Sequence, residues 1–154
     1  MKTKILFLFV ALTLLTSCSQ HQFSQFDTFG EDNHWLHNDV KIFEFEIVDD
    51  AQLYDVNFRF SHVYGYQFPT VPIRFVIESP DGNKENLSVD LALKDSGGKE
   101  VGDCAGDICD LEYPVKNKAR LIKGKYKITV SHDFKEAAYL PNVIGVGLNV
   151  DSVK

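Results

Sequence analysis

Residues 54–61 read Tyr-Asp-Val-Asn-Phe-Arg-Phe-Ser, and this stretch decides the fold class. Apolar and polar residues alternate strictly along it, which places the two kinds of side chain on opposite faces of a β-strand. Residues 40–48 repeat this period, with aromatic and aliphatic residues on one face and glutamates on the other. The two stretches predict half-buried strands of a sheet with one solvated face.

Five further segments toward the C-terminus show the same alternation. They are residues 73–77, 87–93, 111–115, 126–130 and 144–150. Ser79-Pro80-Asp81-Gly82-Asn83 predicts a hairpin turn, because Pro presets a turn dihedral and Gly accepts a positive φ. Only residues 133–140 have the composition of a short helix, which Pro141 would end. We therefore expect an all-β protein, a single antiparallel β-sandwich of about seven to eight strands, over residues 35–154.

The first 18 residues have the organisation of a lipoprotein signal. Lys2 and Lys4 precede the apolar run of residues 5–15, which has the length of a signal segment and is too short to span a bilayer. Leu15-Thr16-Ser17-Cys18 follows, with two small residues directly before the cysteine. We predict that residues 1–17 are a signal peptide and that Cys18 receives diacylglycerol and acyl chains, which anchor the protein to a membrane.

Residues 18–34 are polar with scattered aromatic residues, and we expect a lipidated N-terminus followed by a tether. The chain has 16 Lys and Arg residues against 22 Asp and Glu residues, and Lys2 and Lys4 lie in the signal segment. This acidic balance argues against nucleic acid as a partner. It is compatible with a domain that a lipid anchor holds beside a membrane.

Cys104 and Cys109 form an even pair in a chain with an export signal, in the segment Cys-Ala-Gly-Asp-Ile-Cys. A disulfide is the favoured interpretation, since a hairpin through the glycine would bring the sulfurs together. Two reduced thiols are the first alternative. Half of a metal site is the second, and it would need two more ligands that no nearby pattern supplies.

Motifs for catalysis are absent from the sequence, which has no Gly-rich phosphate loop, no G-x-S-x-G and no H-E-x-x-H. His34 and His37 flank Trp35-Leu36, and we interpret them as polar residues around a Trp anchor rather than as metal ligands. Asp103, Asp107 and Asp110 lack the order of a Ca²⁺ loop and suit turns better. We therefore expect no enzyme activity, no metal and no cofactor beyond the lipid on Cys18.

Tyr64, Tyr66 and Phe68 place three aromatic side chains in five positions between a strand and Pro69. They would form a patch that stacks on sugar or binds a partner, or else fold back as a lid on the end of the sandwich. The lid is favoured. The patch supports an alternative function, a lipid-anchored β-sandwich that binds carbohydrate or another ligand.

The order of these features resembles GldH, a family of gliding-motility lipoproteins of the Bacteroidetes. The segments that carry the resemblance are Leu14-Leu15-Thr16-Ser17-Cys18, Trp35, Asp39-Val40, the strand with Arg59, Tyr66-Gln67-Phe68-Pro69, Pro80-Asp81-Gly82, Leu91-Ala92-Leu93-Lys94-Asp95, Gly106-Asp107-Ile108, Gly124-Lys125-Tyr126 and Leu140-x-x-Val143-x-x-Val146-Gly147-Leu148. They extend over nearly the whole chain. The Cys104/Cys109 pair is not part of the resemblance.

The resemblance implies an outer-membrane lipoprotein that gliding motility and the associated type nine secretion machinery require, without catalytic activity and with other proteins of that apparatus as partners. Lipoproteins of this bacterial group that reach the cell surface tend to carry an acidic cluster after the lipidated cysteine. Here no carboxylate occurs between Cys18 and Asp27. We therefore expect the domain to face the periplasm, on a tether of about 16 residues that reaches some tens of ångströms.

Overall fold

The strand predicted at residues 54–61 forms the middle of β4 (Leu53–Val63), in a computed structural model that describes residues 21–153. The other strands are β1 (His21–Thr28), β2 (Trp35–Leu36), β3 (Lys41–Ile47), β5 (Thr70–Glu78), β6 (Lys84–Ala92), β7 (Asp103–Ala105), β8 (Ile108–Arg120), β9 (Gly124–His132), β10 (Tyr139–Leu140) and β11 (Val143–Val153). Within this range, no helix is long and apolar enough to cross a membrane.

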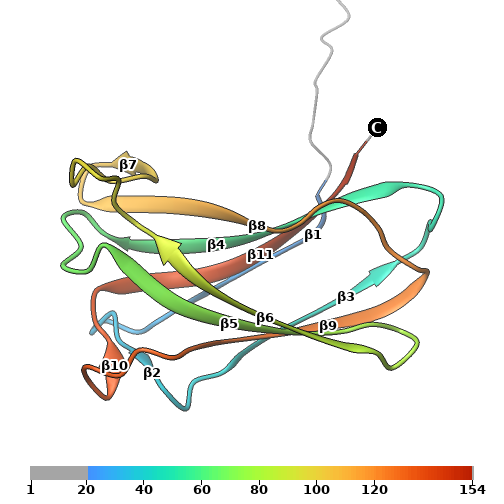
Figure 1. Cartoon of the computed structure of the whole chain (residues 1–154), viewed down its shortest axis with the longest axis horizontal. Coiled ribbons are helices and arrows are strands. Elements are labelled where there is room, and N and C mark those ends of the chain that lie inside the picture. The colour runs from blue at the N-terminus through green and yellow to red at the C-terminus, as the bar shows by residue number, and fades with distance from the viewer. Residues whose placement is uncertain (1–20, 154) are drawn as a thin grey trace, which may run out of the picture.

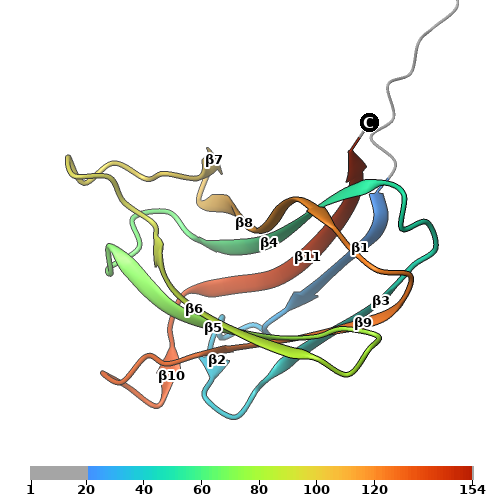
Figure 2. The ribbon, with the colours of Figure 1, turned by 45° about the vertical axis from the view of Figure 1, so that its right-hand side comes forward.

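The strands form two sheets that face each other, as Figures 1 and 2 show from two directions. The larger sheet has the order β1-β11-β4-β8-β7, the smaller one has the order β3-β9-β5-β6, and β10 pairs with β2 in a separate two-stranded sheet. All pairings between these strands are antiparallel. The prediction of an all-β antiparallel sandwich is confirmed.

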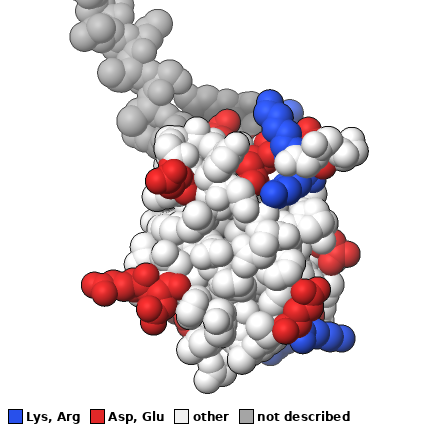
Figure 3. Space-filling view, turned by 90° about the vertical axis from the view of Figure 1, so that its left-hand side faces the viewer, with Lys and Arg blue, Asp and Glu red and all other residues white. Residues whose placement is uncertain are grey.

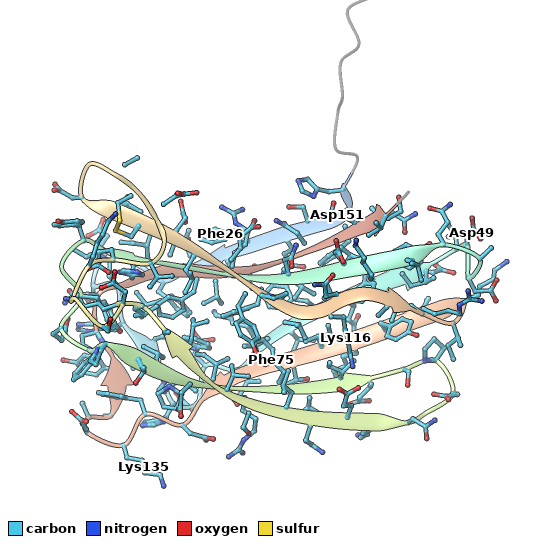
Figure 4. The ribbon with its side chains drawn as sticks, turned by 45° about the horizontal axis from the view of Figure 1, so that its top comes forward. Phe26, Asp49, Phe75, Lys116, Lys135 and Asp151 are labelled. Atoms are coloured by element: carbon cyan, nitrogen blue, oxygen red, sulfur yellow. A yellow bond between two sulfur atoms is a disulfide. The ribbon has the colours of Figure 1, made fainter. Side chains whose placement is uncertain are left out.

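Aromatic side chains fill the space between the two sheets. Phe58 on β4 and Phe75 on β5 are both fully buried, and their rings meet edge to face with centroids 5.1 Å apart. Figure 4 labels Phe75, which lies between the sheets. Tyr113 on β8 stacks on the same ring from the larger sheet. Every second residue of each central strand is buried in this core, and this burial is the physical cause of the period-two pattern in the sequence.

The expectation of a tether through residue 34 is wrong for the part of the chain that the structure describes. Residues 21–28 form β1, which pairs with β11 from His21 opposite Asp151 to Thr28 opposite Gly145. Figure 2 shows β1 alongside β11 with the start of β1 near the C-terminus. The side chains of β1 are exposed or only half-buried, so backbone pairing rather than an apolar face holds the strand in the sheet. For this reason the sequence pattern did not predict it.

The short helix expected at residues 133–140 is also absent. This segment crosses irregularly from β9 to β10, and Tyr139 and Leu140 pair with Leu36 and Trp35. Phe134 and Leu140 are buried, so tertiary packing decides this conformation. The hairpin turn at residues 79–83 is confirmed, and Gly82 has the positive φ of 82° that the turn requires.

Glycines on β11 allow the ring of Phe26 to lie against the outer face of the larger sheet. A Cβ atom added at Gly147 would lie 2.6 Å from the Gln25 carbonyl oxygen and 2.8 Å from the Phe26 ring. The Arg59 guanidinium covers the ring from β4, 5.0 Å from its centroid. Figure 4 labels Phe26 on this side of the sheet. Glycine is thus needed on β11 for close contact with β1.

Gly147→Ala is expected to lower the free energy of unfolding by about 1–3 kcal/mol, because the new methyl group displaces β1. Urea denaturation measures the change. Gly30→Ala is the matched control, since a Cβ there meets no atom within 4 Å, and it should change stability by no more than about 0.5 kcal/mol. Equal stability of the two variants would contradict this account of β11.

Candidate functional site

The hairpin of β7 and β8 carries a disulfide at one end of the sandwich. Cys104 and Cys109 lie directly opposite each other in the β7–β8 pairing and are bonded, with an S–S distance of 2.00 Å. Figure 4 shows this bond in yellow at the left. Gly106, in the turn between the strands, has a φ of 61°. The disulfide prediction is confirmed, because the two-residue turn sets the register that joins the cysteines.

Cys104→Ala is expected to be mild for folding. The disulfide closes a loop much shorter than the 15-residue loop for which about 3 kcal/mol is estimated, so the lost stability should be smaller than that. Urea denaturation of the variant and of the wild-type protein with reductant measures it. Intact mass with and without reductant should differ by two hydrogen atoms in the wild type alone. A loss above about 3 kcal/mol would contradict the loop-length argument.

His62 lies next to the disulfide, on the inner side of the larger sheet. It is opposite Cys109 in the β4–β8 pairing, so Cys104, Cys109 and His62 form one row across three strands. Cys104 is exposed, whereas Cys109 and His62 are each 0% exposed. The row therefore leads from the surface into the protein.

One ring nitrogen of His62 has no partner. Nδ1 lies 2.9 Å from the Val63 carbonyl oxygen, which only accepts hydrogen bonds, so Nδ1 carries the hydrogen. Nε2 is buried without a hydrogen-bond partner, and in the tautomer with its hydrogen on Nδ1 it carries the free lone pair. Buried polar atoms are rarely left unpaired, which makes this nitrogen a candidate for ligand binding.

Glu100 completes the cluster from the loop between β6 and β7. Its side chain is 8% exposed, and its Oε1 accepts a hydrogen bond from the Gly65 amide at 3.1 Å. Lys94 Nζ lies 3.8 Å from the same oxygen, while Oε2 is buried without a partner. His62, Glu100 and Cys109 each offer one ligand atom, and these atoms lie within 4.8 Å of one another. The structure thus places beside Cys109 two side chains with potential ligand atoms, His62 and Glu100, which the sequence pattern did not reveal.

The three aromatic residues singled out in the sequence do not share a surface. Tyr64 is 60% exposed, whereas Tyr66 is 1% exposed and Phe68 is half-buried against the core. The Tyr66 ring meets His62 and Phe68 edge to face, at 5.1 Å and 6.0 Å between centroids. Burial raises the pKa of Tyr66, and its hydroxyl has no partner. Tyr66 thus folds back onto the end of the sandwich as the lid interpretation predicts, and Tyr64 is the one strongly exposed ring of the three.

One end of the sandwich has a broad uncharged area. Figure 3 views this end and shows both acidic and basic side chains around the margin of that area. β2 and the turn after β4 lie here in Figure 1 and carry exposed Leu36 and Tyr64. Asp103, Asp107 and Asp110 lie nearby on the exposed β7–β8 hairpin. Asp107 occupies the turn, as interpreted from the sequence, but that interpretation is wrong for Asp103 and Asp110, which lie on β7 and β8 and pair with each other.

Trp35 is a buried anchor, as the sequence indicated. Its ring stacks on Phe29 and meets His132 at an edge, and its Nε1–H donates to the Asp39 carbonyl at 2.6 Å. The flanking histidines do not converge on a metal site. His34 stacks on Tyr139, and His37 contacts the Ala137 carbonyl at 3.1 Å.

Acidification from about pH 7.5 to 5.5 is expected to lower the free energy of unfolding through His132. Burial, followed by the adjacent His37, lowers the pKa of His132 in the folded protein. The unfolded chain takes up this proton near the ordinary pKa of about 6.5, so protonation favours unfolding as the pH falls through that value. Urea denaturation across this range should show a flatter profile for His132→Gln than for the wild type. Identical pH slopes would contradict this assignment.

Comparison with known proteins gives a match to the GldH lipoprotein family over residues 21–150. A relative, the gliding motility lipoprotein GldH of Flavobacterium johnsoniae, is 23% identical over 88% of this chain and 84% of its own length. The predicted lipid site, Cys18, lies outside the described residues, three positions before β1 begins.

Two solved structures resemble the fold weakly. Dimeric latent PorU from Porphyromonas gingivalis matches 86% of this chain at a TM-score of 0.37 and 9% identity, and the matched region is 13% of PorU. A family 35 carbohydrate binding module from Clostridium thermocellum matches 75% of this chain and 95% of its own, at a TM-score of 0.33 and 15% identity. These scores carry no argument about function. The family match spans β1 and almost all of β11, and on this basis the chain belongs to the GldH lipoprotein family.

Proposed function

We propose that this protein is an accessory lipoprotein of the gliding apparatus, which acts through protein contacts and without catalysis. The family match over residues 21–150 carries the proposal, because it includes the whole sandwich apart from the last residues of β11. The name of the F. johnsoniae relative supports a role in gliding motility. We extend the role to the type nine secretion machinery associated with gliding.

The proposed location is the periplasmic leaflet of the outer membrane, with Cys18 as the lipid anchor. The absence of a carboxylate between Cys18 and Asp27 supports this orientation. The position of β1 alters the reach of the domain, because only residues 19 and 20 separate Cys18 from His21. Three Cα-to-Cα steps span at most about 11 Å, so the sandwich stays beside the leaflet. We propose that its partners meet it there.

The neutral end of the sandwich is the surface that we assign to protein contact. Elements at this end carry exposed Leu36 and Tyr64. The central area of this end has few charges in Figure 3, as the cores of protein interfaces do. The opposite end carries His21 at the start of β1. A domain held by Cys18 would thus present the neutral end away from its point of attachment.

Deletion of the gene in a host that both glides and secretes tests the function. Cell displacement on a surface and the amount of secreted protein in the medium are the two measurements. Loss of both, restored by the wild-type gene, is expected. Normal gliding in the deletion strain would overturn the proposal, and lost gliding with normal secretion would restrict it to motility. Protease treatment of intact cells tests the orientation, since a periplasmic domain should survive while a surface domain is digested.

A further inference from the structure

We propose that reduction of the Cys104–Cys109 disulfide opens a binding site for a divalent cation of the zinc class. The ligands are His62 Nε2, the Glu100 carboxylate and the Cys109 thiolate, with the Cys104 thiolate as the fourth. This inference is independent of the role in gliding. It rests on three groups from separate parts of the chain that meet beneath the β7–β8 hairpin.

The geometry suits a single ion. The ligand atoms of His62, Glu100 and Cys109 lie within 4.8 Å of one another. Zinc–ligand distances of about 2.0–2.3 Å put the ligand atoms of a tetrahedral site about 3.3–3.8 Å apart. Cys109 is bonded to Cys104 in the structure, and breaking that bond frees its Sγ to turn toward the other two groups. Small side-chain rotations therefore bring the atoms to binding distance.

His62 is prepared as a ligand by its hydrogen bond. Histidines that bind metal almost always donate their other ring N–H to a carbonyl or carboxylate, which fixes the tautomer and the ring orientation. The Nδ1–H of His62 makes this bond to the Val63 carbonyl and leaves the Nε2 lone pair free. The ring is 0% exposed, so no bulk water competes for that lone pair.

Glu100 supplies a negative oxygen that has no other partner. Oε1 is held by the Gly65 amide and faces Lys94, and these contacts fix the carboxylate while Oε2 stays free. Two thiolates and one carboxylate would give a zinc ion a net charge of about −1, which Lys94 offsets. Burying Glu100 Oε2 and His62 Nε2 without partners costs free energy, unless a cation or a proton binds between them.

The redox step decides whether the site exists. Thiolate, not disulfide, is the sulfur ligand of zinc, so the oxidised hairpin leaves only two strong donors. A dithiol reductant transfers two electrons to the Cys104–Cys109 bond and becomes a disulfide itself. The cysteines take up two protons and release them to solvent when the metal binds. Oxidation would reverse the sequence and expel the ion.

A surface cavity gives the ion a path to the site. It has a volume of about 350 Å³, and Glu100 and Cys104 are both part of its wall. Lys94 and the exposed turn of Gly98 and Lys99 form another part of the wall. Since Cys104 is exposed, a reductant reaches the disulfide from the same side.

Cobalt titration of the lipidated full mature chain, purified in detergent, tests the proposal. A phosphine reductant is used for the reduced sample because it adds no thiol ligand of its own. The reduced protein should bind one Co²⁺ per chain with a thiolate-to-cobalt charge-transfer band, and Zn²⁺ should displace it. The oxidised protein should show no such band. Equal spectra for the two redox forms would overturn the proposal.

Glu100→Gln tests whether the two thiolates of the hairpin bind the ion without the Glu100 carboxylate. It keeps the size of the side chain, and it should weaken Co²⁺ binding by the reduced protein about tenfold or more. Asp110→Asn is the matched control, because it removes an exposed carboxylate directly beside Cys109 and should leave the affinity unchanged. His62→Gln should weaken binding as Glu100→Gln does. A band that neither variant alters would overturn the proposal, since the thiolates alone would then bind the ion.

Discussion

Trp35→Ala should lower the free energy of unfolding by about 3–5 kcal/mol, the range for loss of a large buried aromatic side chain. Trp35 is 0% exposed, and its ring contacts Phe29 and His132 at centroid distances of 5.3 Å and 5.0 Å. The variant also leaves the Asp39 carbonyl without its donor. Truncation thus opens a cavity and removes a partly buried hydrogen bond at once.

The effect should spread beyond Trp35 itself, because this residue joins the two-stranded sheet to the sandwich. Its β2 pairs with β10, while its side chain and carbonyl contact His132 on β9. Urea denaturation, followed by circular dichroism of the backbone so that the readout does not depend on Trp35, measures the loss of stability. Leu36→Ala is the matched control from the same short strand, and its 46% exposure predicts a change within about 0.5 kcal/mol. Similar losses for the two variants would refute the anchor role.

The central strands could be predicted from sequence because their two faces meet different surroundings. Along β4, alternate residues from Tyr54 to Phe60 are buried, and the sequence alone shows this period. The prediction fails at β1, where only Phe23 and Phe26 are large and apolar and the strand is held by its pairing with β11. Backbone pairing at a sheet edge leaves little trace in the side-chain pattern.

The cluster beneath the hairpin could be predicted only in part. His62 lies on the same buried face of β4 as Phe58 and Phe60, where the alternation predicts an apolar residue. A histidine at such a position indicates a candidate functional site and could have been noticed in the sequence. Glu100 gave no such signal, because it lies in a loop rich in Gly and polar residues and approaches His62 only through the tertiary fold. A search for metal-binding motifs near Cys104 and Cys109 therefore could not find the proposed ligands His62 and Glu100, which lie on distant segments of the chain.

The three aromatic residues around Gly65 show a second limit of prediction from sequence. Tyr64, Tyr66 and Phe68 are alike in the sequence, but their exposure differs because the chain turns at Gly65, which has a φ of 74°. That turn directs Tyr66 inward to His62 and leaves Tyr64 outside. A substitution of Tyr66 would consequently report on packing and on the His62 environment, and a test of surface contact has to use Tyr64.

Cys18→Ala should release the protein from the membrane fraction, which is the largest change in behaviour that we predict for a single substitution. The motif Leu15-Thr16-Ser17-Cys18 provides the only cysteine in the first hundred residues. Two or three acyl chains bind a bilayer far more firmly than the marginal anchoring of one chain. Loss of the thiol removes all of them.

Carbonate-washed membranes and the soluble fraction, compared by immunoblotting, measure this release, and mass spectrometry of the N-terminal peptide shows whether lipid is attached. Cys104→Ala is the matched control, because it also removes one cysteine but leaves the lipid site intact, and it should remain with the membranes. Because only residues 19 and 20 separate Cys18 from β1, a lipid anchor on Cys18 would also fix which end of the sandwich adjoins the leaflet. A Cys18→Ala chain that still sediments with washed membranes would show that another part of the protein binds the bilayer.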